Sequence, residues 1–241
     1  MNVICLTHSS RLQGFVELVN NPNHTVVACI VADSDKNIAD LKHFCEHNKI
    51  PFLTSEKRSE LPLLQQFNYE ILLTFGYPYL IKDKVIRSAK YAINCHPTLL
   101  PDYRGIYAAN YAIRFDDEVQ GITVHFLDPG IDTGDIILQK KVPLTLFDTP
   151  ETMKKINRKI EPAAISEAIQ QIDNNTVTRT KQGQPRRKTK TWLTPEDSKI
   201  PEELFSKELY NHLRSCDPER YPAFTIIKGK KVYVKAWWDN E

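Results

Sequence analysis

Short apolar runs recur through the first hundred residues, and stretches with helical spacing lie between them. The runs are rich in β-branched residues and predict buried strands at residues 2–6, 25–32, 50–53, 70–75 and 91–95. Between two of them, Ile38, Leu41 and Phe44 share one face of a helix predicted over 37–49. Strands that alternate with helices predict an α/β fold with an open, mostly parallel, Rossmann-like sheet and right-handed crossovers.

The pattern changes beyond residue 105. A helix is predicted over 107–115, and two alternating segments follow at 121–128 and 134–144. We expect these two segments to form an antiparallel hairpin at or near an edge of the sheet. Thr149 and Pro150 then supply the N-cap and first-turn signals of a long helix.

From about residue 174 the chain becomes polar, basic and interrupted by prolines, which predicts an extended linker. A short helix over 201–216 and two strands joined by a Gly-Lys turn follow. An appendage of this size can hold little core of its own. We therefore expect a Rossmann-like domain over 1–175 and an appendage over 176–241. The exposed hairpin edge and the pair Trp237 and Trp238 need cover, which predicts a homodimer.

Composition narrows the class of protein. The 241 residues carry 26% charged side chains and a formal net charge of +2, which is too small to indicate a nucleic-acid partner. No apolar stretch approaches the roughly 20 residues of a membrane span, and the start of the chain does not resemble a signal peptide, so we expect a cytoplasmic protein. The five cysteines are odd in number and lack metal-ligand spacing, so we expect reduced thiols and no metal.

The stretch "INCHP" carries the first candidate chemistry. Asn94 and His96 stand at the carboxyl end of the strand predicted over 91–95, which is the edge where open α/β sheets bind ligands. Two residues apart on an extended chain, their side chains face the same side. Cys95 lies between them and would point away, so a nucleophilic thiol is the less favoured alternative.

The second candidate feature is the segment "LDPGIDTGD", which holds Asp128, Asp132 and Asp135 after the strand predicted over 121–128. A carboxylate from this loop would orient His96 or raise its pKa. An amide, an imidazole and a carboxylate together form a candidate acyl-transfer site, in which the amide stabilises an oxyanion and the imidazole moves protons. The chain has no G-x-S-x-G motif, which argues against a serine hydrolase. The nearby His125 is interpreted as a hydrogen-bonded structural histidine.

The segments "INCHPTLLPDYRG" (93–105) and "GITVHFLDPGIDTGDIILQ" (121–139) together resemble the formyltransferases that use N10-formyltetrahydrofolate. The resemblance covers roughly residues 1–175, with weaker echoes at 194–197 and 221–225. It implies that Asn94 donates to the oxyanion, that His96 is the general base and that Asp132 orients and charge-balances His96.

The resemblance also implies a folate pocket between two loops. Its expected contacts are Tyr77, Tyr79, Leu80, Ile81, Asp128 and Ile131. The alternative for the residues at 77–81 is plain core packing, and the alternative for Asp128 is a turn former.

Three groups within this family differ in their acceptor. Methionyl-tRNA formyltransferases are longer, and glycinamide ribonucleotide formyltransferases carry a glycine-rich phosphate loop where this chain reads "LTHSSRLQG". The remaining resemblance is to nucleotide-sugar N-formyltransferases, which implies a dTDP-4-amino-4,6-dideoxyhexose acceptor, with dTDP-4-amino-4,6-dideoxyglucose first, in surface polysaccharide or O-antigen synthesis. Expected acceptor contacts are Arg104, Tyr107, Asn110 and Trp192. Arg104 would equally tie down its loop, and Trp192 would either stack on thymine or anchor the chain.

Two further hypotheses belong to other classes. A hydrolase with the same site would release formate from formyltetrahydrofolate, with water as the acceptor. A non-catalytic nucleotide-binding module is disfavoured by the presence of all three of Asn94, His96 and Asp132.

Overall fold

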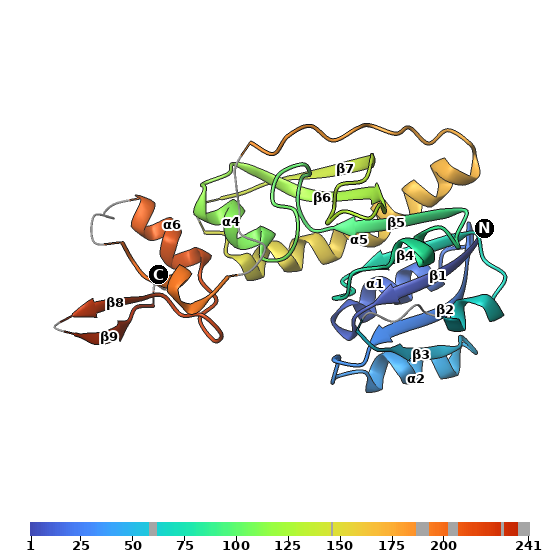
Figure 1. Cartoon of the computed structure of the whole chain (residues 1–241), viewed down its shortest axis with the longest axis horizontal. Helices are drawn as coiled ribbons and strands as arrows, with labels where there is room; N and C mark the ends of the chain where they lie inside the picture. The colour runs from blue at the N-terminus through green and yellow to red at the C-terminus, as the bar shows by residue number, and fades with distance from the viewer. Residues whose placement is uncertain (58–61, 146, 187–192, 202–206, 228, 236–241) are drawn as a thin grey trace.

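The computed structural model describes residues 1–57, 62–145, 147–186, 193–201, 207–227 and 229–235. A large α/β unit makes up most of the molecule, and a smaller unit that contains both strands of a hairpin extends from one end of it (Figure 1). None of the helices within these residues is long and apolar enough to cross a membrane.

Within the described residues, seven strands form the main sheet in the order β3-β2-β1-β4-β5-β6-β7. The first five strands in that order are parallel, and β6 and β7 are antiparallel at the edge, as the hydrophobic pattern predicts. β3 begins two residues later than predicted, after Pro51, which has no N–H to give to the ladder. The strands are β1 (Asn2–Thr7), β2 (Thr25–Ala32), β3 (Phe52–Ser55), β4 (Ile71–Phe75), β5 (Tyr91–His96), β6 (Val119–Phe126) and β7 (Ile136–Pro143).

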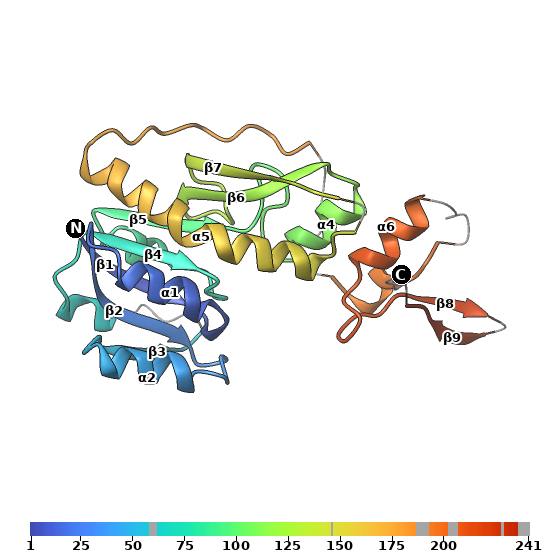
Figure 2. The same ribbon diagram turned by 180° about the vertical axis from the view of Figure 1, so that it is seen from behind.

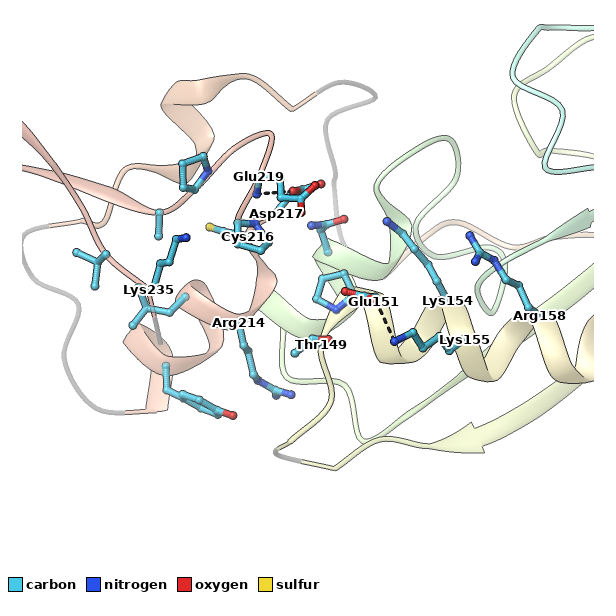
Figure 3. Close-up of a pocket in the computed structure, with 18 residues that line it drawn as sticks. Thr149, Glu151, Lys154, Lys155, Arg158, Arg214, Cys216, Asp217, Glu219 and Lys235 are labelled. Carbon is cyan, nitrogen blue, oxygen red and sulfur yellow. Dashed lines mark hydrogen bonds and ion pairs between the residues drawn. The ribbon is translucent and has the colours of Figure 1, made fainter. Parts of the chain in front are cut away.

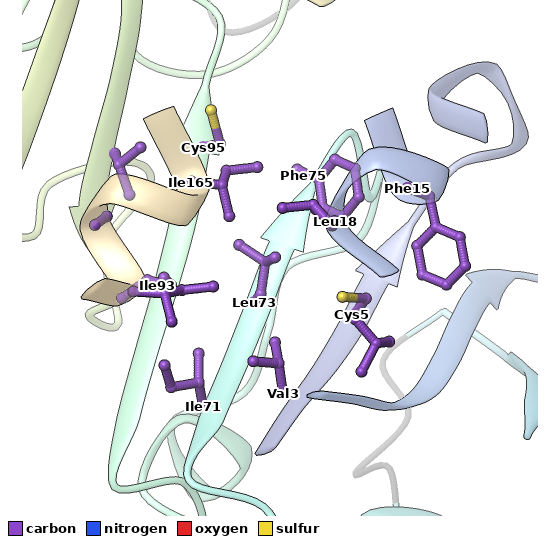
Figure 4. Close-up of a cluster of buried hydrophobic side chains, with 14 of the residues drawn as sticks. Val3, Cys5, Phe15, Leu18, Ile71, Leu73, Phe75, Ile93, Cys95 and Ile165 are labelled. Atoms are coloured by element: carbon purple, nitrogen blue, oxygen red, sulfur yellow. The ribbon is translucent and has the colours of Figure 1, made fainter. Parts of the chain in front are cut away.

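One face of the sheet is covered by α1 (Leu12–Val19), α2 (Ala39–His47) and α5 (Pro150–Asp173) (Figure 2). Fully buried side chains such as Leu73 and Ile93 pack there against residues of α5 (Figure 4). α5 starts at the predicted place, where the Thr149 hydroxyl accepts from the backbone N–H of Thr152.

The opposite face has a smaller core of its own, which includes Ile4, Leu72 and Ala92. The short elements η2 (Pro62–Gln66) and α3 (Asp83–Ile86) lie in the connections that flank β4. Because strand side chains alternate, the even-numbered residues of β5 point to this face, away from α5. Asn94 and His96 are therefore directed away from the large core.

The smaller unit contains η3 (Pro195–Ser198), α6 (Lys207–Ser215) and the hairpin of β8 (Phe224–Ile227) and β9 (Lys230–Tyr233). α6 packs against α4 (Ala108–Arg114) of the large unit. The helix is predicted over 201–216, of which residues 202–206 lie outside the described part of the chain. Trp192, Trp237 and Trp238 also lie outside it, as do residues 187–190.

The linker segment (residues 176–186) connects the two units by running back along the edge strand β7 (Figure 1). Thr180 exchanges two backbone hydrogen bonds with Ile136 of that strand, at 2.8 and 3.0 Å. The guanidinium of Arg179 stacks 3.6 Å from the centre of the Phe126 ring. At its far end, the backbone N–H of Arg186 donates to Asp102 at 2.6 Å. The linker segment is thus attached to the large unit along its length.

Candidate active site

Strand pairing brings three polar residues into one row. Asn94 of β5 lies opposite Thr74 of β4 on one side and His125 of β6 on the other. Each lies among apolar neighbours in its strand, and Thr74 and His125 are almost fully buried. Because neighbouring side chains in such a row point to the same face, they can bond to one another.

The side-chain amide of Asn94 has partners at both ends. Its Oδ1 accepts from the Thr74 hydroxyl at 2.7 Å, which fixes which end is oxygen. Its Nδ2 lies 3.1 Å from Nε2 of His125 and donates to Oδ1 of Asp132 at 3.2 Å. Since Nδ1–H of His125 donates to the Phe126 carbonyl at 2.8 Å, Nε2 is the acceptor. His125 therefore has the structural, hydrogen-bonded role predicted for it, and it is also a direct neighbour of the candidate oxyanion donor.

His96 is 3% exposed and lies between two hydrogen-bond acceptors. Its Nδ1 is 3.3 Å from Oδ2 of Asp132, and its Nε2 is 3.0 Å from the carbonyl oxygen of Tyr103. Burial lowers the pKa of His96, and the carboxylate of Asp132 acts in the opposite direction. The resting ring is thus neutral and can take a proton, and the protonated ring can donate to both acceptors.

Asp132 lies in the loop that follows β6, and its carboxylate contacts side chains of β5 and β6. Burial alone would raise the pKa of its carboxyl group, but His96, His125 and the Gly105 N–H hold that pKa well below its usual range. The Gly105 N–H donates to Oδ2 at 2.8 Å. The backbone of Asp132 is left-handed, with φ of +53°, a conformation that aspartate tolerates better than most residues.

The loop around Asp132 is shaped by close internal contacts. Asp128 accepts from the N–H of Gly130 at 3.1 Å and from the hydroxyl of Thr133 at 2.6 Å, so it forms the turn, which is the alternative stated for it. A Cβ on Gly134 would come within 1.9 Å of the Phe126 carbonyl oxygen, so only glycine fits.

Gln182 of the linker segment bonds to the backbone of the same loop. Its Nε2 donates to the carbonyls of Asp132 and Gly134, at 2.9 and 2.7 Å. Its Oε1 accepts from Nε and Nη2 of Arg104, at 3.1 and 2.8 Å. Arg104 therefore has the alternative role considered for it, as a residue that ties down its loop.

The predicted folate contacts divide into two groups. Tyr77 and Tyr79 make internal hydrogen bonds, to Ser55 at 2.6 Å and to Asp33 at 2.5 Å, and Ile81 packs on the smaller core. Leu80 is 70% exposed and Ile131 is 39% exposed, so each of the two loops presents one apolar side chain to solvent.

Cys95 lies in the large core, on the opposite face from Asn94 and His96, near Ile165 (Figure 4). Burial raises the pKa of its thiol well above the usual value, which disfavours the thiolate that a nucleophile needs. Within the described ranges, no group of three or more histidine, cysteine or acidic side chains could hold a metal ion.

Two of the expected acceptor contacts, Tyr107 and Asn110, lie at the junction of the two units. Tyr107 precedes α4 with a φ of +62°, and its ring packs edge-on against Tyr221, with the ring centres 6.2 Å apart. The amide of Asn110 donates to the backbone carbonyl of Ser215. Both residues line a small hollow, which shares Asn110 with a larger cavity.

The junction cavity, as we name it, has a volume of about 800 Å³ and lies between the first turns of α5 and the smaller unit (Figure 3). Lys155 pairs with Glu151 at 3.0 Å. Lys154 and Arg158 project from the neighbouring part of α5, and Lys235 lies across from them in Figure 3. Within the described residues, neither Lys154 nor Lys235 has an ion pair within 4 Å, although the carboxylates of Glu151, Asp217 and Glu219 line the same cavity.

Several site residues have little or no signal in the sequence. Thr74 could have been found as a polar residue inside an otherwise apolar strand. Tyr103 and Gly105 contribute backbone atoms, for which side-chain identity gives no signal. Gln182 lies in a polar segment where nothing distinguishes it from its neighbours.

The sequence profile described as formyl transferase matches residues 1–169. The chain belongs to the formyl transferase family. It is an enzyme that transfers formyl groups, and the resemblance carried by the two motifs is confirmed. A phosphoribosylglycinamide formyltransferase of Bacillus subtilis is 31% identical over 176 residues, which are 68% of this chain and 90% of that protein. A methionyl-tRNA formyltransferase of Carboxydothermus hydrogenoformans is 28% identical over 224 residues, 88% of this chain and 72% of its own length.

Solved structures with this fold include sugar N-formyltransferases. A 4-N formyltransferase from Francisella tularensis superposes with a TM-score of 0.81 at 20% identity, covering 100% of this chain and 98% of that one. An N-formyltransferase from Helicobacter canadensis, in complex with folinic acid and dTDP-3-aminofucose, gives a TM-score of 0.74 at 21% identity, over 96% of this chain and 85% of that one. These matches confirm the predicted fold, with its mostly parallel sheet and its terminal hairpin.

Proposed function

We propose that this formyltransferase moves a formyl group from N10-formyltetrahydrofolate to the amino group of a dTDP-linked 4-amino-4,6-dideoxyhexose. One observation carries the choice of acceptor: the likeness to the Francisella tularensis 4-N formyltransferase extends over the whole of both chains, the smaller unit included. The Bacillus subtilis relative matches only 68% of this chain. A product of this type would enter surface polysaccharide or O-antigen synthesis.

In the proposed reaction, the amine nitrogen of the acceptor attacks the formyl carbon, and the carbonyl oxygen becomes an oxyanion. The N–H of Asn94 that bonds to Asp132 at 3.2 Å exchanges that partner for the developing oxyanion, which lowers the barrier by roughly 2.7–4 kcal/mol. His96 takes a proton from the attacking nitrogen, and the same proton passes to N10 as the bond between carbon and N10 breaks. The products are the N-formyl sugar nucleotide and tetrahydrofolate.

Asp132 would connect His96 to the substrate. Its side chain is 15% exposed, whereas that of His96 is 4% exposed, so the carboxylate is the more accessible of the two. With Nε2–H donating to Tyr103, Nδ1 is free to accept the proton on the side of Asp132. The amine proton therefore reaches Nδ1 past Asp132, directly or through a water molecule.

For the donor, we propose that the pterin binds between the loops at 76–81 and 127–132. Leu80 and Ile131 supply exposed apolar contacts, one from each loop, and backbone groups would bond to the pterin edge. The first loop would be held in place by its own side chains. Tyr77 bonds to Ser55, Tyr79 bonds to Asp33, and Ile81 packs on the smaller core. Asp128 would act by holding the turn.

For the acceptor, we propose that the nucleoside diphosphate binds in the junction cavity. Tyr107, which lines the small hollow beside it, is two residues from Gly105, whose N–H contacts Asp132. On the other side, Asn157 of α5 donates to the carbonyl of Pro97, next to His96, at 2.9 Å. With a rise of 1.5 Å per helical residue, the start of α5 is roughly 10 Å along the helix from Asn157. We therefore propose that the sugar nucleotide passes the end of the sheet, so that its diphosphate meets Lys154 and Arg158 on α5.

A glycinamide ribonucleotide acceptor is the second candidate, favoured by the 31% identity to the Bacillus subtilis enzyme. The loop after β1 argues against it. The N–H and hydroxyl of Ser9 both donate to the carboxylate of Asp35, at 2.6 and 2.8 Å. A carboxylate that already holds these donors opposes a phosphate at the same place. A methionyl-tRNA acceptor is the third candidate, and this chain spans 51% to 78% of the length of several such enzymes that it matches.

We further propose that residues 1–175 form the catalytic domain and that residues 176–241 mediate a homodimer. The hairpin of β8 and β9 presents four large apolar side chains that are 38–59% exposed: Ile226, Ile227, Val232 and Tyr233. A second copy of the same hairpin would cover them. Light scattering of the wild type should give the mass of a dimer, and the change Ile227→Lys should give a monomer. A monomeric wild type at working concentration contradicts this assembly.

The decisive experiment presents N10-formyltetrahydrofolate with each acceptor in turn and detects the added formyl group by mass spectrometry. The acceptors are dTDP-4-amino-4,6-dideoxyglucose, its galactose epimer, the 3-amino isomers and glycinamide ribonucleotide. We expect formylation of a dTDP-4-amino sugar. Formylation of glycinamide ribonucleotide alone would overturn the proposal, and formate release without any acceptor would favour the hydrolase.

A further inference from the structure

We infer that Gln182 is a positioning residue for catalysis, which holds Asp132 where its carboxylate can bridge Asn94 and His96. The inference rests on the proposed roles of these three residues. The linker segment lies outside residues 1–169, the range that the formyl transferase profile matches. The inference gives this segment a part in building the catalytic centre.

The side-chain amide of Gln182 uses all of its bonding capacity within the protein. Its two N–H groups satisfy two carbonyls of the loop, those of Asp132 and Gly134, and its oxygen holds the guanidinium of Arg104. Arg104 directly precedes Gly105, whose N–H donates to the Asp132 carboxylate. Gln182 therefore fixes the loop that carries Asp132 and also the loop that supplies a backbone donor to Asp132.

The backbone conformation of Asp132 is one that depends on such support. Its φ of +53° lies in a region that non-glycine residues adopt only when surrounding contacts maintain it. The carboxylate then reaches Asn94, His96 and Gly105 with distances of 2.8–3.3 Å. A rotation of the Asp132 peptide toward ordinary backbone angles would carry the carboxylate away from all three groups.

The linker segment presents Gln182 from a fixed backbone. Thr180 pairs with β7 two residues before it, and Arg186 bonds to Asp102 four residues after it. The side chain of Gln182 is half-buried, while Gln184, two residues later, is exposed and has no hydrogen bond within the described residues. Gln182 and Gln184 thus form a matched pair, with the same chemistry two residues apart and contacts in one case only.

The test compares Gln182→Ala, Gln182→Glu and Gln184→Ala in the full-length protein. Glutamate keeps the size of the side chain and the bond to Arg104, but it has no N–H for the two carbonyls. We expect both changes at 182 to lower kcat roughly tenfold to a hundredfold, because a displacement of about 1 Å in a reacting group can cost this much. KM for donor and acceptor should stay within about twofold, and Gln184→Ala should match the wild type.

A second readout does not depend on turnover. The pKa of His96 is measured by NMR from the imidazole signal that is missing in His96→Gln. In Gln182→Ala we expect this pKa to fall below its wild-type value, because the carboxylate that raises it has moved away. A change that only weakened folding would leave the pKa of the folded protein unaltered.

The possible results distinguish a failure of the proposed function from a failure of the positioning role. If the wild type formylates no acceptor but the pKa falls in Gln182→Ala, the proposed function fails and the positioning role stands. If the wild type is active and both changes at 182 keep wild-type kcat and pKa, the positioning role is wrong. If neither variant at 182 folds while Gln184→Ala does, Gln182 acts on stability, and the inference is likewise overturned.

Discussion

The polar side chains of the catalytic centre and of the junction cavity differ in how they are bonded within the protein. In the centre, the side chains of Asn94, His96 and Asp132 are bonded to one another or to the backbone, and His96 is 3% exposed. In the cavity, Lys154 and Lys235 extend from the walls with no ion pair within 4 Å in the described residues.

The difference matches the role that we propose for each region. A group that moves a proton must be held in one place and in one protonation state, so neighbours on three strands and two loops constrain it. A group that binds a diphosphate needs an uncommitted charge, since a charge already paired gains little from a new partner. Changes in the centre should therefore alter kcat, and changes in the cavity should alter KM for the acceptor.

The largest expected effect follows from His96→Gln. Glutamine keeps much of the size of the ring but cannot carry the proton, so kcat should fall by a factor on the order of 10²–10⁴. KM for both substrates should change little, and circular dichroism should match the wild type. A variant that keeps more than a tenth of the wild-type kcat would remove His96 from the role of base.

The pH profile should locate the same group. Because burial lowers the pKa of His96, the neutral base persists below the ordinary value of 6.5, and kcat/KM should be flat above that pH. Below the folded-state pKa, activity should fall about tenfold per pH unit as the ring becomes protonated. In Asp132→Asn the midpoint should move further down, since the lost carboxylate had raised the pKa. A midpoint above 7 in the wild type would contradict the neutral buried ring.

A smaller effect is expected from Thr74→Val, which removes one hydroxyl and keeps the shape. The Asn94 amide then loses the bond that fixes its orientation, so kcat should fall roughly tenfold, which corresponds to about 1.4 kcal/mol for one hydrogen bond. Thr7→Val is the control, because its buried hydroxyl donates to the Phe75 carbonyl outside the row. Equal losses of kcat in the two variants would speak against orientation of Asn94 by Thr74.

The smallest effect should come from the cavity. Lys154→Ala should raise KM for the nucleotide sugar about fivefold, with kcat and KM for the folate unchanged, because one charged contact contributes about 1 kcal/mol near a surface. Lys159→Ala is the matched control, since Lys159 is exposed on the same helix and does not line the cavity. If both variants bind the acceptor like the wild type, the diphosphate binds elsewhere.

Hydrophobic periodicity was enough to predict the sheet, its antiparallel edge and the start of α5, because each depends on local pattern and capping. The i, i+2 spacing also predicted correctly that Asn94 and His96 share a face while Cys95 turns to the core. These inferences need only the geometry of one strand.

Other parts of the site depend on contacts between distant segments. Thr74 and His125 join Asn94 through the strand register, which the sequence does not state. Arg104 carries a charge that suits phosphate, yet its guanidinium holds Gln182, 78 residues further along the chain. The exposed positions of Leu80 and Ile131, beside the internally bonded tyrosines, likewise follow from how two loops fold over the sheet.

The part of the chain that forms the main sheet ends before the linker segment that holds the catalytic loop in place. A fragment that ends at residue 175 would contain every strand of the main sheet and all of Asn94, His96 and Asp132. It would lack Gln182 and the pairing of Thr180 with β7, so that edge strand would be open to other chains. During synthesis, the last strand of the sheet would emerge from the ribosome 39 residues before Gln182, which holds the Asp132 loop in place (Pro143 to Gln182). The smallest piece of this chain worth transplanting or engineering therefore extends to Arg186.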